Sequence, residues 1–406
     1  EESLETAGDT CNDGLDNDCD TLTDDADPGC HDTWWDCELG FRRRIILHHE
    51  QVVADQTDFP VLISLVNDSD LAADAQNDSD DISFASRDGT VQYSHEVEYF
   101  DGGTGTLVAW VKVPALSGSI DTILYLYYGA GGGSRENVAD VWSNGYEAVY
   151  HLHGDWNDST GSHNATGGQT QGYVSGQIAN GVDFEGSSSD YINIGTWSVS
   201  GSALTMQAWV NYESFADEQT IIDKSSATAY DWNLSTDKQG GSYQARIFVS
   251  DSQLNGSTTF STGTWYQVTG KYDASASTKY IHIDNTPDTS SSQTGNLTVN
   301  TDQVRIGDNA TGADEPFDGI IDEVRISSTA RSDAWLNTEY NNVSDPSTFY
   351  TLGSETPATA IDLVFFNASG EGNQVRVDWQ TAEEIRNLGF NLYRGNSPAG
   401  PFVKIN

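Results

Sequence analysis

The feature that most constrains the fold is a run of short alternating strands from about residue 38 to residue 352. Apolar and polar residues alternate in segments such as 59–66, 107–113 and 122–128, and clusters of Gly, Asp, Asn and Ser separate these segments. A period of two puts one face of each strand against a core. No apolar period of 3.6 residues persists for three turns, and only 332–340 has the pattern of a short helix. The sequence therefore predicts an all-β protein.

The chain of 406 residues is too long for one ordinary hydrophobic core. Shifts in composition divide it into four units, which we place at 1–37, 38–141, 142–353 and 354–406. The first unit is polar and rich in Asp and Cys, whereas the other three carry strand patterns. The predicted architecture is a small disulfide-linked segment followed by tandem β-sandwiches.

The charge balance narrows the range of partners. Asp and Glu number 62 against 18 Lys and Arg, for a net charge of −44. Such a chain repels nucleic acid and anionic lipid and attracts cations. No stretch approaches the roughly 18 apolar residues of a membrane span, so no membrane insertion is expected.

Four cysteines lie in the first tenth of the chain: Cys11, Cys19, Cys30 and Cys37. An even number of cysteines in a small polar segment indicates local disulfides, which implies a secreted, extracellular protein. Three pairings are possible and the sequence does not choose among them. A zinc site is the alternative, although the neighbouring Asp and Asn residues suit harder cations.

Acidic residues between these cysteines have the spacing of a calcium-binding loop. Loop positions 1, 3, 5, 9 and 12 are carboxylates, and position 7 offers a backbone carbonyl. The predicted calcium ligands are Asp16, Asp18, Asp20, Leu22, Asp24 and Asp27. Thr21 stands where an EF-hand has Gly, and no flanking helices are expected. The alternative is a disordered acidic tail.

The motif from Cys11 to Asp20, followed by Asp24, Asp27 and Cys30, resembles a Cys- and Asp-rich metal-binding repeat of secreted bacterial and archaeal surface proteins. Residues 41–129 resemble a domain of unknown function found beside laminin-G-like domains in microbial surface proteins. Segments 109–114 and 124–129 carry that second resemblance. It implies a β-sandwich without known catalysis.

Residues 142–350 resemble a concanavalin A-like, laminin-G-type jelly roll, through segments 208–210, 265–268, 280–283 and 317–326. The resemblance implies the fold and leaves the function open, because this fold serves sugar binding, adhesion, catalysis and scaffolding.

A second calcium site is predicted within this jelly roll. The period of two puts one face of the last strand on Ile320, Asp322, Val324 and Ile326. A carboxylate among apolar neighbours needs a partner or a metal. Asp158 lies in the turn 155–163, where the family often has a calcium loop, so Asp158 and Asp322 are predicted to share the ion. The alternative is that Asp322 accepts hydrogen bonds from backbone amides.

Residues 354–406 resemble the first half of a fibronectin type III-like module, through segments 375–379 and 389–394. The later strands of such a module are missing. Either the sequence was cut, or strands of another chain complete the sheet, which would make the protein self-associate.

No catalytic motif is found. The run from His48 to Glu50 is not a zinc-protease motif, and the acidic strand motif of jelly-roll glycosidases does not occur. His151 and His153 could form a metal pair, but packed or exposed histidines are commoner.

The sequence thus predicts a non-enzymatic, calcium-binding structural or adhesive cell-surface protein, with a subunit of a self-assembling filament, sheath or surface layer as one form of that role. The alternative is a carbohydrate-binding module whose aromatic residues stack on sugar rings. Candidates for such stacking, which could equally be core residues, are Trp156, Trp197 and Trp232.

Overall fold

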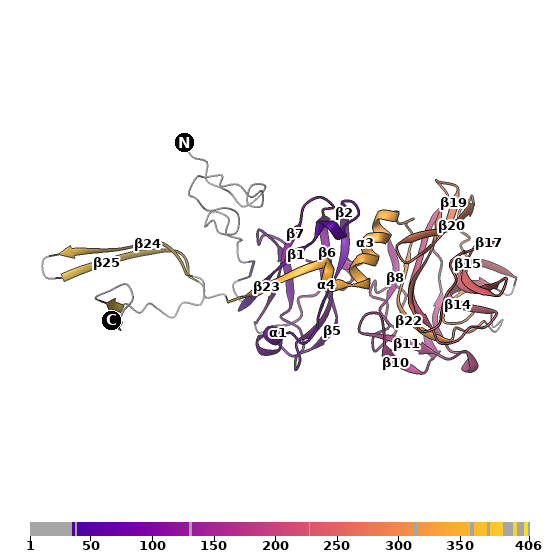
Figure 1. Ribbon diagram of the computed structural model, residues 1–406, viewed down its shortest axis with the longest axis horizontal. Coiled ribbons are helices and arrows are strands. Elements are labelled where there is room, and N and C mark those ends of the chain that lie inside the picture. The colour runs from indigo at the N-terminus through magenta and orange to yellow at the C-terminus, as the bar shows by residue number, and fades with distance from the viewer. Residues whose placement is uncertain are drawn as a thin grey trace.

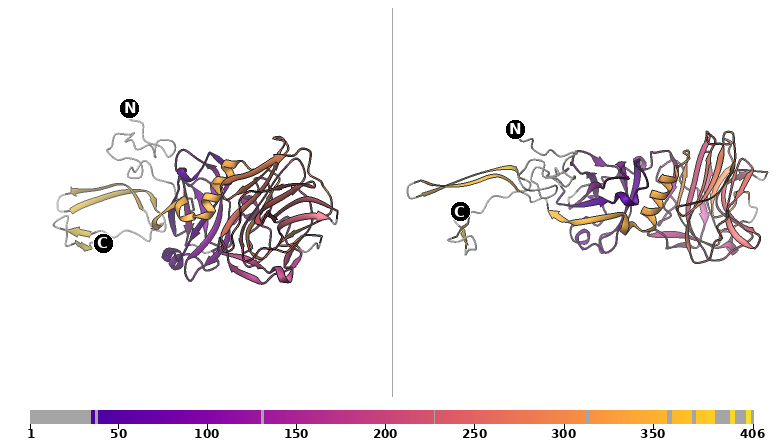
Figure 2. Two further views of the ribbon diagram at one scale, coloured as in Figure 1. Left: turned by 45° about the vertical axis from the view of Figure 1, so that its right-hand side comes forward. Right: turned by 45° about the horizontal axis from the view of Figure 1, so that its top comes forward.

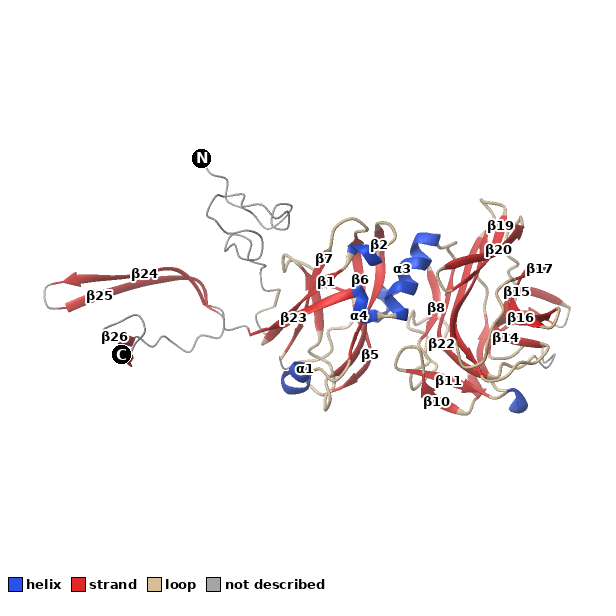
Figure 3. Ribbon diagram, viewed as in Figure 1, coloured by secondary structure: helices blue, strands red, loops and turns tan. Residues whose placement is uncertain are grey.

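The computed structural model describes residues 35–36, 39–129, 132–226, 228–311 and 315–357, and then the strand segments 361–371, 374–384, 393–395 and 402–404. The predicted calcium loop and all four cysteines lie outside the described residues, so both remain predictions. The described chain is mostly β, and its paired strands form antiparallel sheets, which confirms the predicted fold class (Figure 3).

The first sandwich packs a five-stranded sheet against a three-stranded one. The larger sheet has the order β23 (Tyr350–Pro357), β1 (Phe41–Leu47), β7 (Thr122–Tyr128), β3 (Ser83–Ser86) and β4 (Gln92–Tyr93). The smaller sheet has the order β2 (Gln56–Leu65), β6 (Thr106–Leu116) and β5 (His95–Asp101). Apolar side chains of both sheets form one core, which includes Ile45, Phe59, Trp110 and Leu124.

The jelly roll consists of an eight-stranded and a seven-stranded sheet. The first has the order β10 (Gly172–Ser175), β11 (Asn180–Phe184), β22 (Gly319–Ser327), β13 (Ala203–Tyr212), β18 (Trp265–Asp273), β19 (Thr278–Ile283) and β20 (Thr286–Ser292), with β8 (Tyr146–Tyr150) also paired to β22. The second has the order β17 (Ser252–Asn255), β16 (Ser242–Val249), β15 (Ala229–Gln239), β14 (Glu218–Ser226), β21 (Gln303–Ile306), β12 (Tyr191–Thr196) and β9 (Gly167–Gln169). Their core includes Met206, Trp232, Ile247 and Val268.

After the jelly roll the chain returns to the first sandwich (Figures 1 and 2). Helix α3 (Asp333–Ser344) covers the predicted helical segment, and the Ser332 hydroxyl caps it by accepting from Trp335 N. Helix α4 (Pro346–Phe349) follows, and β23 then pairs with β1. Figures 1 and 2 show α3 between the two sandwiches. The end of the predicted 142–353 unit therefore lies on the first sandwich.

The side chain of Asn342 joins helix α3 to β2 by forming the pair of backbone hydrogen bonds that a neighbouring strand would form. Asn342 is buried, its Oδ1 accepts from Leu62 N at 2.6 Å, and its Nδ2 donates to Leu62 O at 3.0 Å. Both backbone groups of Leu62 are thereby satisfied, which fixes the helix against the first sandwich.

A β-bulge in β22 turns charged side chains towards the first sandwich. Glu323 has a φ of 50°, and Glu323 and Val324 together face the single Ala208 of β13. The jelly-roll core therefore contains Ile321, Val324 and Ile326. The prediction of one shared face is wrong, because the extra residue breaks the period of two. The residues predicted to share that face were Ile320, Asp322, Val324 and Ile326.

The remaining elements are short or peripheral. Two hairpins, β24 (Ile361–Glu371) with β25 (Gln374–Glu384) and β26 (Tyr393–Gly395) with β27 (Phe402–Lys404), follow the sandwiches. The short helical segments are α1 (Ser69–Asp74), α2 (Val138–Val141), η3 (His49–Gln51) and η4 (Gly186–Ser188). Among the described residues, no helix has the length and apolar character needed to cross a membrane.

Candidate ligand-binding cleft between the two sandwiches

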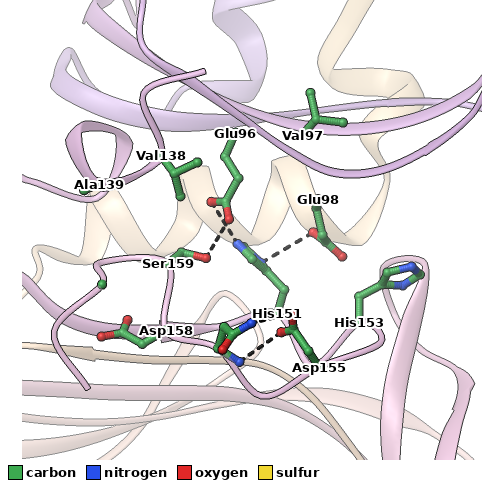
Figure 4. Close-up of a pocket in the computed structure, with 12 residues that line it drawn as sticks. Glu96, Val97, Glu98, Val138, Ala139, His151, His153, Asp155, Asp158 and Ser159 are labelled. Carbon is green, nitrogen blue, oxygen red and sulfur yellow. Dashed lines mark hydrogen bonds and ion pairs between the residues drawn. The ribbon is translucent and has the colours of Figure 1, made fainter. Parts of the chain in front are cut away.

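A pocket of about 430 Å³, rich in carboxylates, opens between the first sandwich and the jelly roll. Strand β5 forms one side, where Glu96 and Glu98 point the same way because they are two residues apart. The segment after β8 forms the other side (Figure 4). The lining residues are Glu96, Val97, Glu98, Val138, Ala139, His151, His153, Asp155, Asn157, Asp158, Ser159 and Gly161.

His151 makes the central contacts of this pocket. Its side chain is 8% exposed, and its ring stacks on Trp110 with centroids 5.6 Å apart. Nδ1 lies 2.8 Å from Glu323 Oε1 and 3.4 Å from Glu98 Oε2, and Nε2 lies 3.2 Å from Glu96 Oε2. One imidazole therefore contacts glutamates of both domains.

Burial and charge set the protonation of this cluster. Burial alone would lower the pKa of His151, but the charges of Glu323, Glu96 and Glu98 outweigh it and raise the pKa well above its ordinary value. Burial, reinforced by the charge of Glu323, raises the pKa of Glu98 to about 8. Burial also acts to raise the pKa of Glu96, but the His151 cation outweighs it and the pKa is lowered. At neutral pH the cluster therefore holds an imidazolium, an ionised Glu96 and a protonated Glu98.

Indole and hydroxyl groups behind the two β5 glutamates fix their orientation. Glu96 accepts from Trp142 Nε1 and from Ser159 Oγ, both at 2.6 Å. Glu98 Oε2 accepts from Trp110 Nε1 at 2.8 Å. The Glu98 side chain is only 2% exposed, and its other oxygen, Oε1, has no hydrogen-bond partner.

Arg325 supplies the counter-charge on the jelly-roll side. Its guanidinium lies 2.6 Å from Glu323 Oε2 and pairs with Glu339. It also lies over the rings of Trp110 and Trp142, at 4.4 and 5.0 Å from their centroids. Burial would lower the pKa of Arg325, but Glu339 and Glu323 outweigh burial and raise it, so the cation persists.

A second hollow of about 270 Å³ adjoins the first and is less acidic. Tyr99 and His153 lie side by side in its wall, with ring centroids 4.9 Å apart. Because His153 Nδ1 accepts from Asn180 N at 3.1 Å, the proton of the neutral ring is on Nε2. The wall consists of Ser64, Val66, Tyr99, Thr106, Val108, His153, Ala179 and Asn180. His153 lines both hollows, which we together call the interdomain cleft.

Asp158 organises the loop that borders the cleft. Its carboxylate accepts from the backbone N–H groups of Val149, Thr160, Ser162 and His163, at 2.9, 3.0, 3.1 and 2.8 Å, and from the Thr160 hydroxyl at 2.6 Å. These donors come from the loop itself and from β8. The Asp158 carboxylate therefore stabilises the turn by accepting hydrogen bonds from its backbone N–H groups.

Asp322 is fully buried and accepts from Ile178 N at 2.9 Å. Gly176 lies directly on this carboxylate, since an added Cβ would be 2.5 Å from Oδ2. Burial, followed by the charge of Glu323, raises the pKa of Asp322 well above its ordinary value. The backbone hydrogen bond considered as the alternative for Asp322 is thus present.

The predicted calcium shared by Asp158 and Asp322 remains a prediction. No hydrogen bond of the described chain joins the two carboxylates, which are held by different loops. Neither belongs to the groups of three potential metal ligands found among the described residues.

The three tryptophans considered for sugar stacking differ in burial. Trp232 is a core residue, whereas Trp156 and Trp197 pack on the jelly-roll core while partly exposed. Trp197 already stacks on His163, with centroids 4.0 Å apart. Of the two histidines considered as a metal pair, His151 lies among carboxylates and His153 lies beside Tyr99.

Sequence reasoning did not identify Glu96, Glu98, Glu323 or Arg325. The spacing of Glu96 and Glu98 was a usable signal, because two carboxylates two residues apart lie on the same face if the segment is a strand. No comparable signal marks Glu323, whose direction depends on the bulge.

Two family models match the chain. Residues 185–337 match the family described as Concanavalin A-like lectin/glucanases superfamily. Residues 78–166 match the family described as Domain of unknown function (DUF2341). The chain thus contains a DUF2341 domain followed by a concanavalin A-like, laminin-G domain, which confirms both resemblances in outline. The His151 cluster takes residues from both matched regions.

Several solved structures are similar to this chain. Domain 4 of AbnA, a GH43 extracellular arabinanase from Geobacillus stearothermophilus, in complex with arabinotriose, is 22% identical, with 48% of this chain and 98% of that chain covered and a TM-score of 0.41. The binding domain of Paraclostridial Mosquitocidal Protein 1 is 11% identical, with coverages of 66% and 74% and a TM-score of 0.39. The botulinum neurotoxin serotype G binding domain is 14% identical, with coverages of 48% and 50% and a TM-score of 0.37. No curated protein sequence is significantly similar to this chain.

Proposed function

We propose that this chain is an extracellular, non-enzymatic carbohydrate-binding protein whose ligand lies in the interdomain cleft. The match of residues 185–337 to the lectin and glucanase superfamily supports a sugar ligand. The observation that carries the proposal is the position of His153, which joins a carboxylate-lined hollow to one with an aromatic wall.

The two hollows suit the two kinds of surface that a sugar presents. Sugar hydroxyls donate hydrogen bonds, and Asp155 and Asn157 are exposed acceptors at the mouth of the acidic hollow. The apolar face of a sugar ring packs on aromatic rings, which Tyr99 and His153 supply. A few convergent polar groups beside an apolar wall are typical of small-ligand sites.

The arrangement of the carboxylates favours binding over hydrolysis. Glycosidases place a sugar between two carboxyl groups that are several ångströms apart. Here the His151 ring lies between Glu96 and Glu98 and contacts both, so it fills the space that a scissile bond would need.

An extracellular location and calcium binding remain part of this proposal. They are supported by the closely spaced cysteines and by the Asp spacing between Asp16 and Asp27. Chelation is expected to lower the melting temperature, since calcium binds the native state only. An unchanged melt in chelator would contradict calcium binding.

A glycan array probed with the full chain tests the sugar proposal, followed by calorimetry with the best glycan. The variant His153→Ala should weaken binding by about tenfold, equivalent to about 1.4 kcal/mol. His163→Ala is the matched control, because His163 also stacks on an aromatic ring but lines neither hollow. Absence of any glycan binding, or equal losses in both variants, would refute the proposal.

A structural role as an assembly subunit is the second candidate. In the part of the chain that the structure describes, β24 and β25 pair only with each other, and Phe366 and Val375 are 55% and 65% exposed. An isolated two-stranded hairpin with apolar exposed residues gains stability from added strands. Light scattering should then show self-association that Phe366→Ser reduces. A monomer at all concentrations would exclude this role.

A further inference from the structure

We propose that Glu98, His151 and Glu323 bind a divalent cation of the zinc class, which links the first sandwich to the jelly roll. The three residues come from β5, from the segment after β8 and from β22. One potential ligand atom of each lies within 4.8 Å of the other two. This site does not depend on the proposed sugar ligand.

Each of the three side chains has a further partner that fixes its orientation. The Glu98 carboxylate accepts from Trp110 through Oε2, and the Glu323 carboxylate pairs with Arg325 through Oε2. On His151, Nε2 faces Glu96. His151 Nδ1 faces Glu323 Oε1 and the Glu98 carboxylate, whose Oε1 has no hydrogen-bond partner. Outer partners of this kind orient ligands around protein-bound zinc.

The unpartnered oxygen of Glu98 is the independent evidence for a missing partner. The Glu98 side chain is 2% exposed and points at His151, yet Oε1 has no hydrogen-bond partner (Figure 4). A buried carboxylate oxygen without a partner is costly, and such atoms in native proteins usually have an ion or water beside them.

The ligand atoms select the metal. One imidazole nitrogen with two carboxylate oxygens suits zinc and similar first-row ions, whereas calcium takes six to eight oxygens. Zinc bonds of about 2.0–2.2 Å hold tetrahedral ligand atoms roughly 3.4 Å apart. The 3.4 Å between His151 Nδ1 and Glu98 Oε2 matches this value, and the 2.8 Å to Glu323 Oε1 is a hydrogen bond that the ion would replace. Because Glu98 and His151 also line the acidic hollow, a fourth ligand can enter from it.

Zinc titration of the metal-stripped full chain, followed by calorimetry, tests the site. Wild type should bind one zinc ion more per chain than Glu98→Gln, or bind it at least tenfold more tightly. Gln retains the acceptor for Trp110, so the fold should persist. The matched control is Glu213→Gln, which alters an exposed acidic group that Glu213 forms with Asp183 and Glu185, and it should leave zinc binding unchanged. Equal zinc binding by wild type and Glu98→Gln, or an equal loss in the control, would overturn the proposal.

X-ray absorption of zinc-loaded wild type addresses the same site without any variant. The spectrum should show oxygen and nitrogen ligands with an imidazole contribution. A spectrum of sulfur ligands alone would place the metal at the cysteines of the first unit and overturn the proposal.

Discussion

His151 Nδ1 and Glu323 Oε1 lie 2.8 Å apart, although 172 positions separate the two residues in the chain. His151 follows β8, whereas Glu323 is the bulged residue of β22. Strands β8 and β22 pair directly, which brings the two residues together. The carboxylates of β5 complete the cluster from the other domain, so the candidate site is also part of the contact between the two domains.

Removing the positive charge of Arg325 should destabilise both domains together. Arg325→Met removes the guanidinium that pairs with the buried Glu323 and Glu339. Glu323 keeps its contact with His151, but Glu339 loses its counter-charge, so we expect a loss of about 3–5 kcal/mol in the free energy of unfolding. Urea titration followed by tryptophan fluorescence measures this loss, because Arg325 lies over Trp110 and Trp142. Arg376→Met, at an exposed ion pair, should cost less than about 1 kcal/mol. Similar losses in both variants would contradict this account.

The docking of α3 should depend on Asn342. Asn342→Leu leaves the buried N–H and C=O of Leu62 without partners, at a cost of about 2–4 kcal/mol. Hydrogen exchange at the Leu62 amide should accelerate accordingly. Asn341→Leu removes only a hydrogen bond to Gln51 O at a partly exposed position, and its effect should be less than half as large. Unchanged exchange in Asn342→Leu would show that the helix does not need this contact.

Asp158→Asn should destabilise the loop at the cleft and also test the predicted second calcium. In Asp158→Asn an NH2 group replaces one acceptor oxygen and faces backbone N–H donors, so hydrogen bonds are lost. We expect the free energy of unfolding to fall by about 2 kcal/mol. Thermal melts with and without calcium then separate two roles. If Asp158 only forms hydrogen bonds, calcium raises the melting temperature of variant and wild type equally. A smaller calcium effect in Asp158→Asn would instead support the shared site.

The free energy of unfolding should fall between about pH 4.5 and pH 7 because of Glu315. Burial, reinforced by Glu218, raises the pKa of Glu315 from 4.5 to about 7. The folded state thus binds a proton that the unfolded state has lost between these values, so this contribution is complete below about pH 4.5 and lost above pH 7. Relative to Glu315→Gln, wild type should lose about 1–2 kcal/mol over this range, less than the full shift because solvent screens Glu218. Parallel pH profiles of the two proteins would contradict this assignment.

Local sequence patterns were enough to predict the local structure of this protein. Alternating strands predicted the all-β class, the signal at 332–340 predicted α3, and short motifs in 109–129 and 317–326 indicated the two domain types. These features depend on neighbours within a few residues, whose period and turn chemistry are visible in the sequence.

The places where the charged residues meet could not be predicted, because they depend on long-range strand pairing. The bulge at Glu323 reversed the face predicted for part of β22, because one inserted residue changes every later direction in the strand. The pairing of β23 with β1 brought the end of the second domain back to the first. Contacts of this kind join residues far apart in the chain. Their net free energy depends on the entropy of loop closure and on tertiary packing, neither of which a local sequence pattern encodes.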